Sequence, residues 1–199
     1  MARPVIDYFL APQSPYCYLG HARLGAIAQK HGARIHLKPI DLGAKVFPLS
    51  GGLPLAKRPA QRQSYRFVEL KRWSEFLNVP LNLNPRFFPV TGDFAALMCL
   101  AAPSDEAGFS FAGAVLKAVW ADELNIADQT VLIALANNLG LNGAAIAELA
   151  PQMQDQYDLF TQQAIEANVF GAPWLVFNGE PFWGQDRLDF LDRALSSHK

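Results

Sequence analysis

Hydrophobic residues at the start of the chain form two short runs separated by a helical pattern. Residues 5–10 are β-branched or aromatic except for Asp7 and the closing leucine, which is typical of a buried strand. Ser14 followed by Pro15 is a helix-start signature, and apolar residues then recur at helical spacing to about residue 31. Residues 34–40 alternate between polar and apolar, which predicts a strand at a sheet edge. The pattern predicts a β-α-β unit with parallel strands.

The middle of the chain has helical patterns and no strand signal. Prolines and glycines are frequent in residues 41–59, so we expect a long loop there, of a kind that often serves a function. A helix is predicted from residue 60, with its large apolar residues on one face and Arg66 away from that face. Asp93 and Asp128 are predicted helix caps. Helices are expected over residues 60–77, 93–100, 104–120, 128–140, 143–150 and 152–167.

Strand signals return only near the end of the chain. Residues 174–177 and 180–183 flank Asn178-Gly179, which is a strong signal for a two-residue hairpin turn. A last helix is predicted to begin near Asp186. The chain therefore reads as a β-α-β unit, a long helical block and a β-β-α unit.

This order predicts an α/β protein, a thioredoxin-like fold interrupted by a large all-α insertion. We expect residues 1–42 and 168–199 to form one discontinuous thioredoxin-like domain, and residues 43–167 to form a helical insertion domain. The carboxyl ends of the parallel strands are the expected place for the site.

Composition and charge exclude several classes of function. The chain has 199 residues, of which 51% are hydrophobic and 18% charged, so it can bury a substantial core. With a net charge of −1 and no basic footprint, we expect no nucleic-acid partner. No apolar run approaches the ~18 residues of a membrane span and no signal peptide is evident, so we expect no membrane partner and a cytoplasmic location. The two cysteines, Cys17 and Cys99, are expected to be reduced and buried.

The segment Ser14-Pro15-Tyr16-Cys17 carries the first chemical signal. It is Cys-x-x-Cys with the first cysteine replaced by serine, directly after a strand and at the start of a helix. In redox motifs of this kind the first cysteine is the low-pKa nucleophile, so dithiol exchange is not expected here. Ser14 alone could serve only as a helix cap. The helix N-terminus can also stabilise an anion, such as a thiolate, placed beside the Ser14 hydroxyl.

The chain resembles the 2-hydroxychromene-2-carboxylate isomerases and the kappa-class glutathione transferases of the DsbA-like thioredoxin group. In these proteins a serine at this position activates the thiol of bound glutathione, so the resemblance implies glutathione as cofactor and Ser14 as the catalytic residue. This chain departs from many relatives at Gly52, where they carry asparagine, and at Cys17, where serine is common. The matching segments are the first strand with Ser14-Pro15, Asp41-Leu-Gly, Gly51-Gly52-Leu-Pro54, residues 65–73, Trp120-Ala-Asp-Glu, Gly171-Ala-Pro173 and residues 183–187.

The resemblance also implies a set of glutathione contacts. Thioredoxin-like folds place a cis-proline where Ala172-Pro173 stands, which would leave the Ala172 backbone free to pair with glutathione. The turn at residues 183–186 would hold the γ-glutamyl end of glutathione, and Arg62 would lie near its glycine carboxylate. Asp186 as a plain helix cap and Arg62 as a solvated charge are the alternatives. The implied glutathione-binding residues are Ser14, Arg62, Ala172, Pro173, Trp183, Gly184, Gln185 and Asp186.

As the resemblance implies, the substrate is a small aromatic 2-oxo acid whose double bond is isomerised through reversible thiolate addition. Candidate substrate contacts are Lys45, Gly52, Leu53, Phe87 and Phe88. For Lys45 alone, a solvated surface charge is the simpler interpretation. A transferase that consumes glutathione, and a thioredoxin-like binding module without activity, are the alternatives.

The remaining expectations concern metals and assembly. The histidines His21, His31, His36 and His198 show no ligand spacing, so we expect no metal site and place these residues at the surface or at helix ends. The resemblance implies a homodimer, although the sequence itself indicates no interface.

Overall fold

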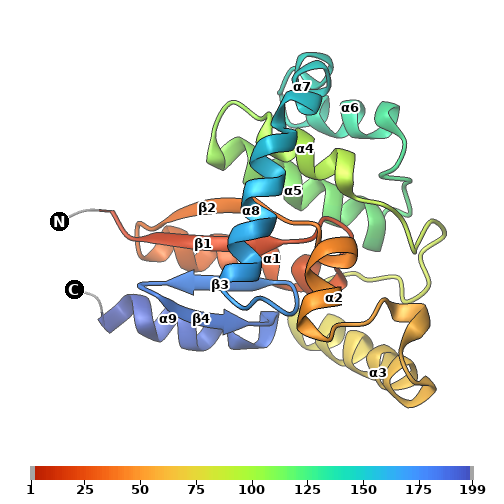
Figure 1. Ribbon diagram of the computed structural model, residues 1–199, viewed down its shortest axis with the longest axis vertical. Coiled ribbons are helices and arrows are strands. Elements are labelled where there is room, and N and C mark those ends of the chain that lie inside the picture. The colour runs from red at the N-terminus through yellow and green to blue at the C-terminus, as the bar shows by residue number, and fades with distance from the viewer. Residues whose placement is uncertain (1–2, 198–199) are drawn as a thin grey trace.

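A four-stranded mixed sheet lies at the centre of the computed structural model, which describes residues 3–197 (Figure 1). The strand order is β2-β1-β3-β4, where β1 and β2 are parallel and the other neighbours are antiparallel. The predicted edge position of the second strand is confirmed. The strands are β1 (Val5–Leu10), β2 (Arg34–Pro39), β3 (Trp174–Phe177) and β4 (Glu180–Trp183).

The strand register brings three distant segments to one end of the sheet. Phe9, near the end of β1, pairs with Trp174 at the start of β3, and Trp174 pairs in turn with Trp183 at the end of β4. The segments that follow β1, precede β3 and follow β4 must therefore meet. This end of the sheet points toward α2 and α3, away from the labelled N and C ends (Figure 1).

The helices lie on both faces of the sheet and beyond its edge β2 (Figure 1). α8 crosses one face, and α1 lies behind the sheet beside α9. In the described part of the chain, no helix is both long and apolar enough to span a membrane. The helices are α1 (Pro15–Lys30), α2 (Phe47–Ser50), α3 (Ala60–Leu77), α4 (Asp93–Leu100), α5 (Asp105–Trp120), α6 (Gln129–Asn138), α7 (Gly143–Leu149), α8 (Gln154–Glu166) and α9 (Leu188–Ser197).

Most predicted helix ends are confirmed, with one cap and one loop that differ. The Asp128 side chain accepts a hydrogen bond from the Thr130 N–H, as an N-cap does. Asp93, in contrast, is the first residue of α4 and makes no capping bond, because the N-cap is Gly92. The predicted loop at residues 41–59 was wrong in part. It contains a π-helical turn at Leu42–Val46, the short helix α2 and a 3₁₀ turn at Leu55–Lys57.

Pro48 explains why the loop prediction failed. Proline frequency is a breaker signal, but Pro48 occupies the first turn of α2, where the missing N–H would have no helical partner. Gly51 then ends the helix in the left-handed region, with φ of 73°.

One hydrophobic core extends from the sheet into the helical segment. Tyr8 on β1 and Cys17 on α1 are buried in the same cluster as Phe111, Leu116 and Trp120 on α5. The segments on either side of the predicted boundaries thus share a core, and their division into two domains stays a prediction.

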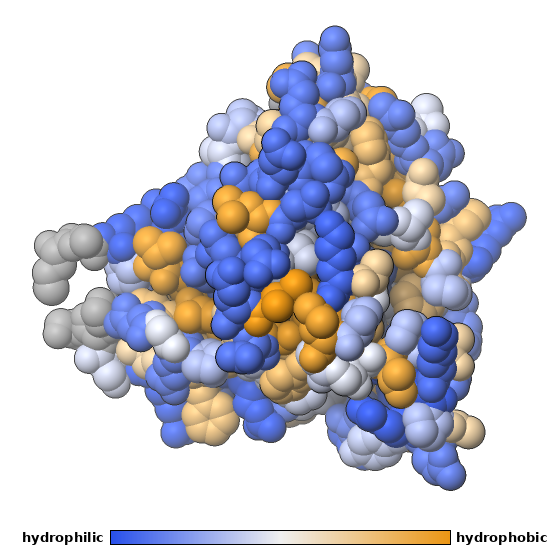
Figure 2. All heavy atoms as spheres, in the orientation of Figure 1, coloured by the Kyte–Doolittle hydropathy of each residue, from blue (hydrophilic) through white to orange (hydrophobic). Residues whose placement is uncertain are grey.

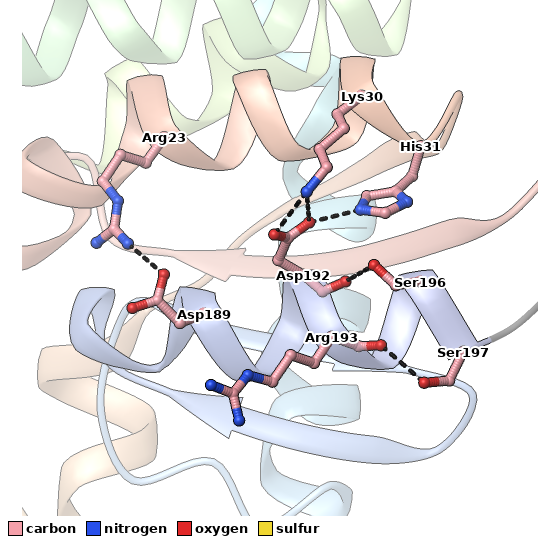
Figure 3. Close-up of polar contacts among 8 residues, drawn as sticks. All are labelled: Arg23, Lys30, His31, Asp189, Asp192, Arg193, Ser196 and Ser197. Carbon is pink, nitrogen blue, oxygen red and sulfur yellow. Dashed lines mark hydrogen bonds and ion pairs between the residues drawn. The ribbon is translucent and has the colours of Figure 1, made fainter.

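Ion pairs join α1 to α9 along their length (Figure 3). Arg23 pairs with Asp189 at 2.9 Å, and Asp192 accepts from Lys30 at 2.8 Å and from His31 at 2.5 Å. Pairs as exposed as these stabilise weakly one by one, but together they align the two helices. Because α9 begins just after the turn that follows β4, the alignment also fixes that turn against α1.

The predicted hairpin turn is confirmed. Asn178 and Gly179 have φ values of 50° and 80°, and two successive positive φ values are the mark of the turn that suits a twisted hairpin. Gly184, after β4, has φ of 100° and ψ of 153°, a region open almost only to glycine. Its N–H donates to the Pro173 carbonyl at 2.9 Å.

His21 contradicts the expected surface placement of the histidines. Its side chain is buried in α1, stacked on the Phe109 ring with centroids 3.9 Å apart. Gly113 on α5 provides the space, since a Cβ there would lie 2.9 Å from the imidazole. Nε2 lies 2.9 Å from the Phe109 carbonyl, which can only accept, so Nε2 carries the proton. Burial lowers the pKa of His21 to about 4. His198 lies outside the described residues.

His21 should make the protein less stable as the pH falls from about 6.5 to about 4. The folded pKa lies below the unfolded value, so the unfolded chain takes up the proton first. The contribution of neutral His21 to the free energy of unfolding is fully present above the unfolded pKa. It is lost as the pH falls to the folded pKa, and amounts to about 3 kcal/mol in all. Urea unfolding at several pH values gives the free energy of unfolding at each pH. Between pH 6.5 and 4 this free energy should fall less for His21→Leu than for the native chain. A His21 imidazole that titrates near 6.5 by NMR would contradict this expectation.

Replacing Gly184 by alanine should lower the free energy of unfolding by about 2 kcal/mol or more, because its backbone region is strained for any Cβ. That Cβ would also collide with the Asp186 carboxylate. Gly179→Ala is the matched control, since Gly179 also has positive φ but has open space around it, and should cost about 1 kcal/mol. Chemical denaturation measures both, and equal losses would show that the Asp186 contact has no effect.

Candidate functional site

Ser14 lies at the end of the sheet where the three segments meet. It is the N-cap of α1, and its Oγ accepts a hydrogen bond from the Cys17 N–H at 3.2 Å. The same hydroxyl donates to the Ala172 carbonyl at 3.2 Å. The first turn of α1 contains no acidic residue, so nothing in that turn opposes an anion at the helix N-terminus. The predicted cap is therefore confirmed, and the hydroxyl also contacts the segment before β3.

The Ala172-Pro173 peptide bond is cis, as expected from its place in the chain. The two carbonyls of this dipeptide tie the segments together: Ala172 accepts from Ser14, and Pro173 accepts from the Gly184 N–H. The peptide bond between Phe88 and Pro89 is also cis, and the sequence pattern gave no indication of it.

The predicted residues at the end of β4 and in the turn that follows it differ in how far they are exposed. Trp183 is half exposed and lies over Gly171, where a Cβ would be 2.5 Å from the indole Nε1. The Asp186 carboxylate is partly exposed and lies 3.5 Å from Arg187. Gln185, in contrast, is buried against Gly20 of α1, and its Oε1 has no partner among residues 3–197.

Apolar side chains reach the surface near this turn. Figure 2 shows them gathered beside α2 and the lower end of α8. Phe170, which follows α8, packs edge-on against Trp174 and Trp183, with ring centroids 4.9 and 4.6 Å away. Leu49 on α2 is 70% exposed. The end of the sheet thus offers both polar groups and an open apolar surface.

Basic residues from α3 and the turn before it face the start of α1. Tyr16, in the first turn of α1, has its pKa raised by burial; the nearby charges of Arg66 and Arg58 oppose that rise, and those of Glu69 and Asp186 add to it. Arg62 is exposed and close enough to Arg58 for their charges to repel. The structure therefore brings the predicted Arg62 into a positive cluster near Tyr16.

Phe88 and Trp120 lie beside the loop that carries Ser14. Their ring centroids are 4.7 Å apart, and the Trp120 indole donates to the Gln13 carbonyl at 3.3 Å. Phe87 contacts Arg86 instead. Sequence reasoning missed Gln13 and the role of Trp120, because a tryptophan on an apolar helix stripe reads as core.

The other predicted substrate contacts are spread more widely. Lys45 forms an ion pair with Asp158 on α8 at 2.7 Å, and this hydrogen bond raises the pKa of Lys45. Gly52 packs against the Phe47 ring, and the Leu53 carbonyl accepts from Arg58 Nε at 2.8 Å. Leu53 therefore adjoins the basic cluster, whereas Lys45 is held toward α8.

Both cysteines are free and buried, as expected. Burial raises the pKa of Cys17 to about 11, although the neighbouring Ser14 side chain opposes the rise. Burial also raises the pKa of Cys99. Neither side chain is a ready thiolate near neutral pH, so a reactive sulfur at this site must come from a bound molecule.

Neither a group of metal ligands nor a cavity beside β2 involves these residues. Among residues 3–197, no three His, Cys, Asp or Glu side chains are grouped so that they could hold a metal ion. A cavity of about 210 Å³ lies at the edge strand β2, lined by residues such as His36, Cys99 and Phe160. Ser14 does not line it, so the candidate site is the open end of the sheet.

Comparison with known proteins agrees with this arrangement. The profile of the DSBA-like thioredoxin domain matches residues 5–196. The chain is 30% identical over 192 residues to the 2-hydroxychromene-2-carboxylate isomerase of Sphingobium xenophagum, with 96% of this chain and 97% of that protein covered. The corresponding isomerase of Pseudomonas sp. (strain C18) is 27% identical over 197 residues, covering 96% and 90%. A solved structure of a 2-hydroxychromene-2-carboxylate isomerase, 26% identical, superimposes with a TM-score of 0.79 over 97% of this chain and 95% of that one. The chain belongs to the DSBA-like thioredoxin family and, within it, to the group of the 2-hydroxychromene-2-carboxylate isomerases.

Proposed function

We propose that this protein is a glutathione-dependent isomerase that interconverts 2-hydroxychromene-2-carboxylate and trans-o-hydroxybenzylidenepyruvate. The name and coverage of its relatives support an isomerase of this kind. The observation that carries the proposal is the Ser14 hydroxyl at the N-terminus of α1, bonded to the carbonyl that precedes the cis-proline. This arrangement suits a thiolate brought in by a ligand, since Cys17 is buried with a raised pKa.

The residues at the end of the sheet fit glutathione. The backbone of Ala172 would pair with its peptide, with Pro173 and Trp183 packed beside it. Gly184 would let the γ-glutamyl end approach closely, Asp186 would accept from its ammonium group, and Gln185 would support this turn from inside. Arg62, in the basic cluster, would lie near the glycine carboxylate.

Ser14 would act on the thiol rather than on the substrate. Bound glutathione would supply a thiolate that adds reversibly to the unsaturated carbon of the 2-oxo acid, so that the bond can rotate before the thiolate is expelled again. The Ser14 hydroxyl would donate to that thiolate in place of the Ala172 carbonyl. The free N–H groups at the start of α1 would favour the charged form and lower the thiol pKa.

A transferase that consumes glutathione would use the same contacts. Following total glutathione during conversion of the chromene separates the two activities, because an isomerase leaves its concentration unchanged. Absence of glutathione binding would leave a binding module instead.

Ser14→Ala should raise the pKa of glutathione bound to the protein and slow isomerisation by about 100-fold, because a hydrogen bond to the developing charge is lost. Calorimetry gives the affinity, and thiolate ultraviolet absorbance across pH gives the pKa of the bound thiol.

Ser104→Ala is the matched control for Ser14→Ala. Ser104 caps α5 by accepting from the Ala107 N–H at 3.1 Å, so both variants lose an N-cap worth about 1 kcal/mol. Only the Ser14 variant should change the thiol pKa. An unchanged thiol pKa in Ser14→Ala would refute its role in activation.

A further inference from the structure

Arg66 is a buried charge without a counter-ion. It lies on α3 and is 7% exposed, and only Leu70 shares its buried position on that helix. Within residues 3–197, its side chain forms no hydrogen bond or ion pair that satisfies ordinary geometry. The sequence pattern placed Arg66 away from the packed face. That prediction was wrong, because α3 turns Arg66 inward and leaves Phe76 77% exposed.

The nearest acid along α3 is already occupied. Glu69 accepts from Arg72 and, at 3.2 Å, from the Trp73 indole. The Glu69 carboxylate therefore has two partners of its own, although it also lies close enough to Tyr16 to raise the pKa of that side chain. Burial lowers the pKa of Arg66, but a guanidinium with an ordinary pKa above ~12 stays protonated at neutral pH. A buried charge left in this way is costly unless an anion binds to it.

Aromatic rings hold the guanidinium group in place. Its carbon lies 5.4 Å from the centroid of Phe88 and 5.5 Å from that of Trp120. Contacts with ring faces leave the N–H groups, which point outward in the guanidinium plane, available to an acceptor. A planar carboxylate can accept two of these bonds at once.

The same two rings connect Arg66 to the reactive end of the sheet. Trp120 donates to the carbonyl of Gln13, the residue before Ser14, and Tyr16 lies within electrostatic reach of Arg66. An anion bound by Arg66 would therefore lie beside the first turn of α1, with aromatic surface next to it.

We propose that Arg66 binds the carboxylate of the aromatic 2-oxo acid substrate, on a platform formed by Phe88 and Trp120. This inference rests on the proposed isomerase function. Lys45, the other basic residue considered as a substrate contact, is paired with Asp158 and is therefore less available to a carboxylate. Arg62, which is exposed, remains the candidate for the glycine carboxylate of glutathione.

The test uses a probe that cannot be isomerised. The saturated analogue 4-(2-hydroxyphenyl)-2-oxobutanoate has no double bond for a thiolate to attack, and its methyl ester lacks the negative charge. Calorimetry on the glutathione-loaded protein measures both affinities in the native chain and in Arg66→Met, Arg66→Lys and Lys71→Met. Lys71 is an exposed cation on the same helix and serves as the control.

The native chain and Lys71→Met should bind the acid more tightly than the ester. Arg66→Met should weaken binding of the acid by about 30-fold or more and leave the ester unchanged, since a partly buried charge pair is lost. The affinity of Arg66→Lys for the acid should lie between those of the native chain and Arg66→Met, because an ammonium group cannot donate two parallel hydrogen bonds to the carboxylate. Equal affinity of Arg66→Met and the native chain for the acid, or failure of the native chain to bind it, would overturn the proposal.

Thermal unfolding distinguishes binding from a structural role. Removing an uncompensated buried charge should leave the midpoint of Arg66→Met unchanged or raise it, whereas loss of a structural arginine would lower it. If the native chain prefers the acid and Arg66→Met does not, but no chromene is converted, the proposed isomerase fails while the carboxylate site stands.

Discussion

The hydrogen bond from Ser14 to the Ala172 carbonyl spans 158 residues of sequence and is the contact on which the rest of the site depends. It exists because β3 runs antiparallel to β1 and begins where β1 ends. The antiparallel pairing of β3 and β4 then brings Gly184 to the Pro173 carbonyl. A shift of register by one residue would turn the side chains to opposite faces and separate these groups.

Much of the sheet and its turns could be predicted because their signals are local. A continuous apolar run indicates the first strand and alternation indicates the second, and Asn178-Gly179 specifies its turn through the positive φ values that these residues tolerate. Ser14 and Asp128 cap helices through side chains that bond the next few N–H groups. The cis bond before Pro173 was predictable only from its place in the fold.

The features that could not be predicted depend on contacts between distant segments. The apolar pattern of α3 indicated one buried face, but docking against Phe88 and Trp120 turned Arg66 inward instead. Likewise, His21 is buried because α5 carries a glycine where the two helices cross. Nothing in the local sequence around Arg66 or His21 specifies these partners, so period and composition alone assign them to the surface.

Trp120 belongs to the hydrophobic core and also contacts Gln13, the residue before Ser14. A residue that supports stability and also shapes a binding surface has little freedom to vary. For the substrate site proposed above, divergence in substrate preference should therefore accumulate around Trp120 rather than at it, at candidate contacts such as Leu53 and Phe87. Trp120 itself would then be inherited almost unchanged, and the positions around it would be the productive place to begin redesigning selectivity.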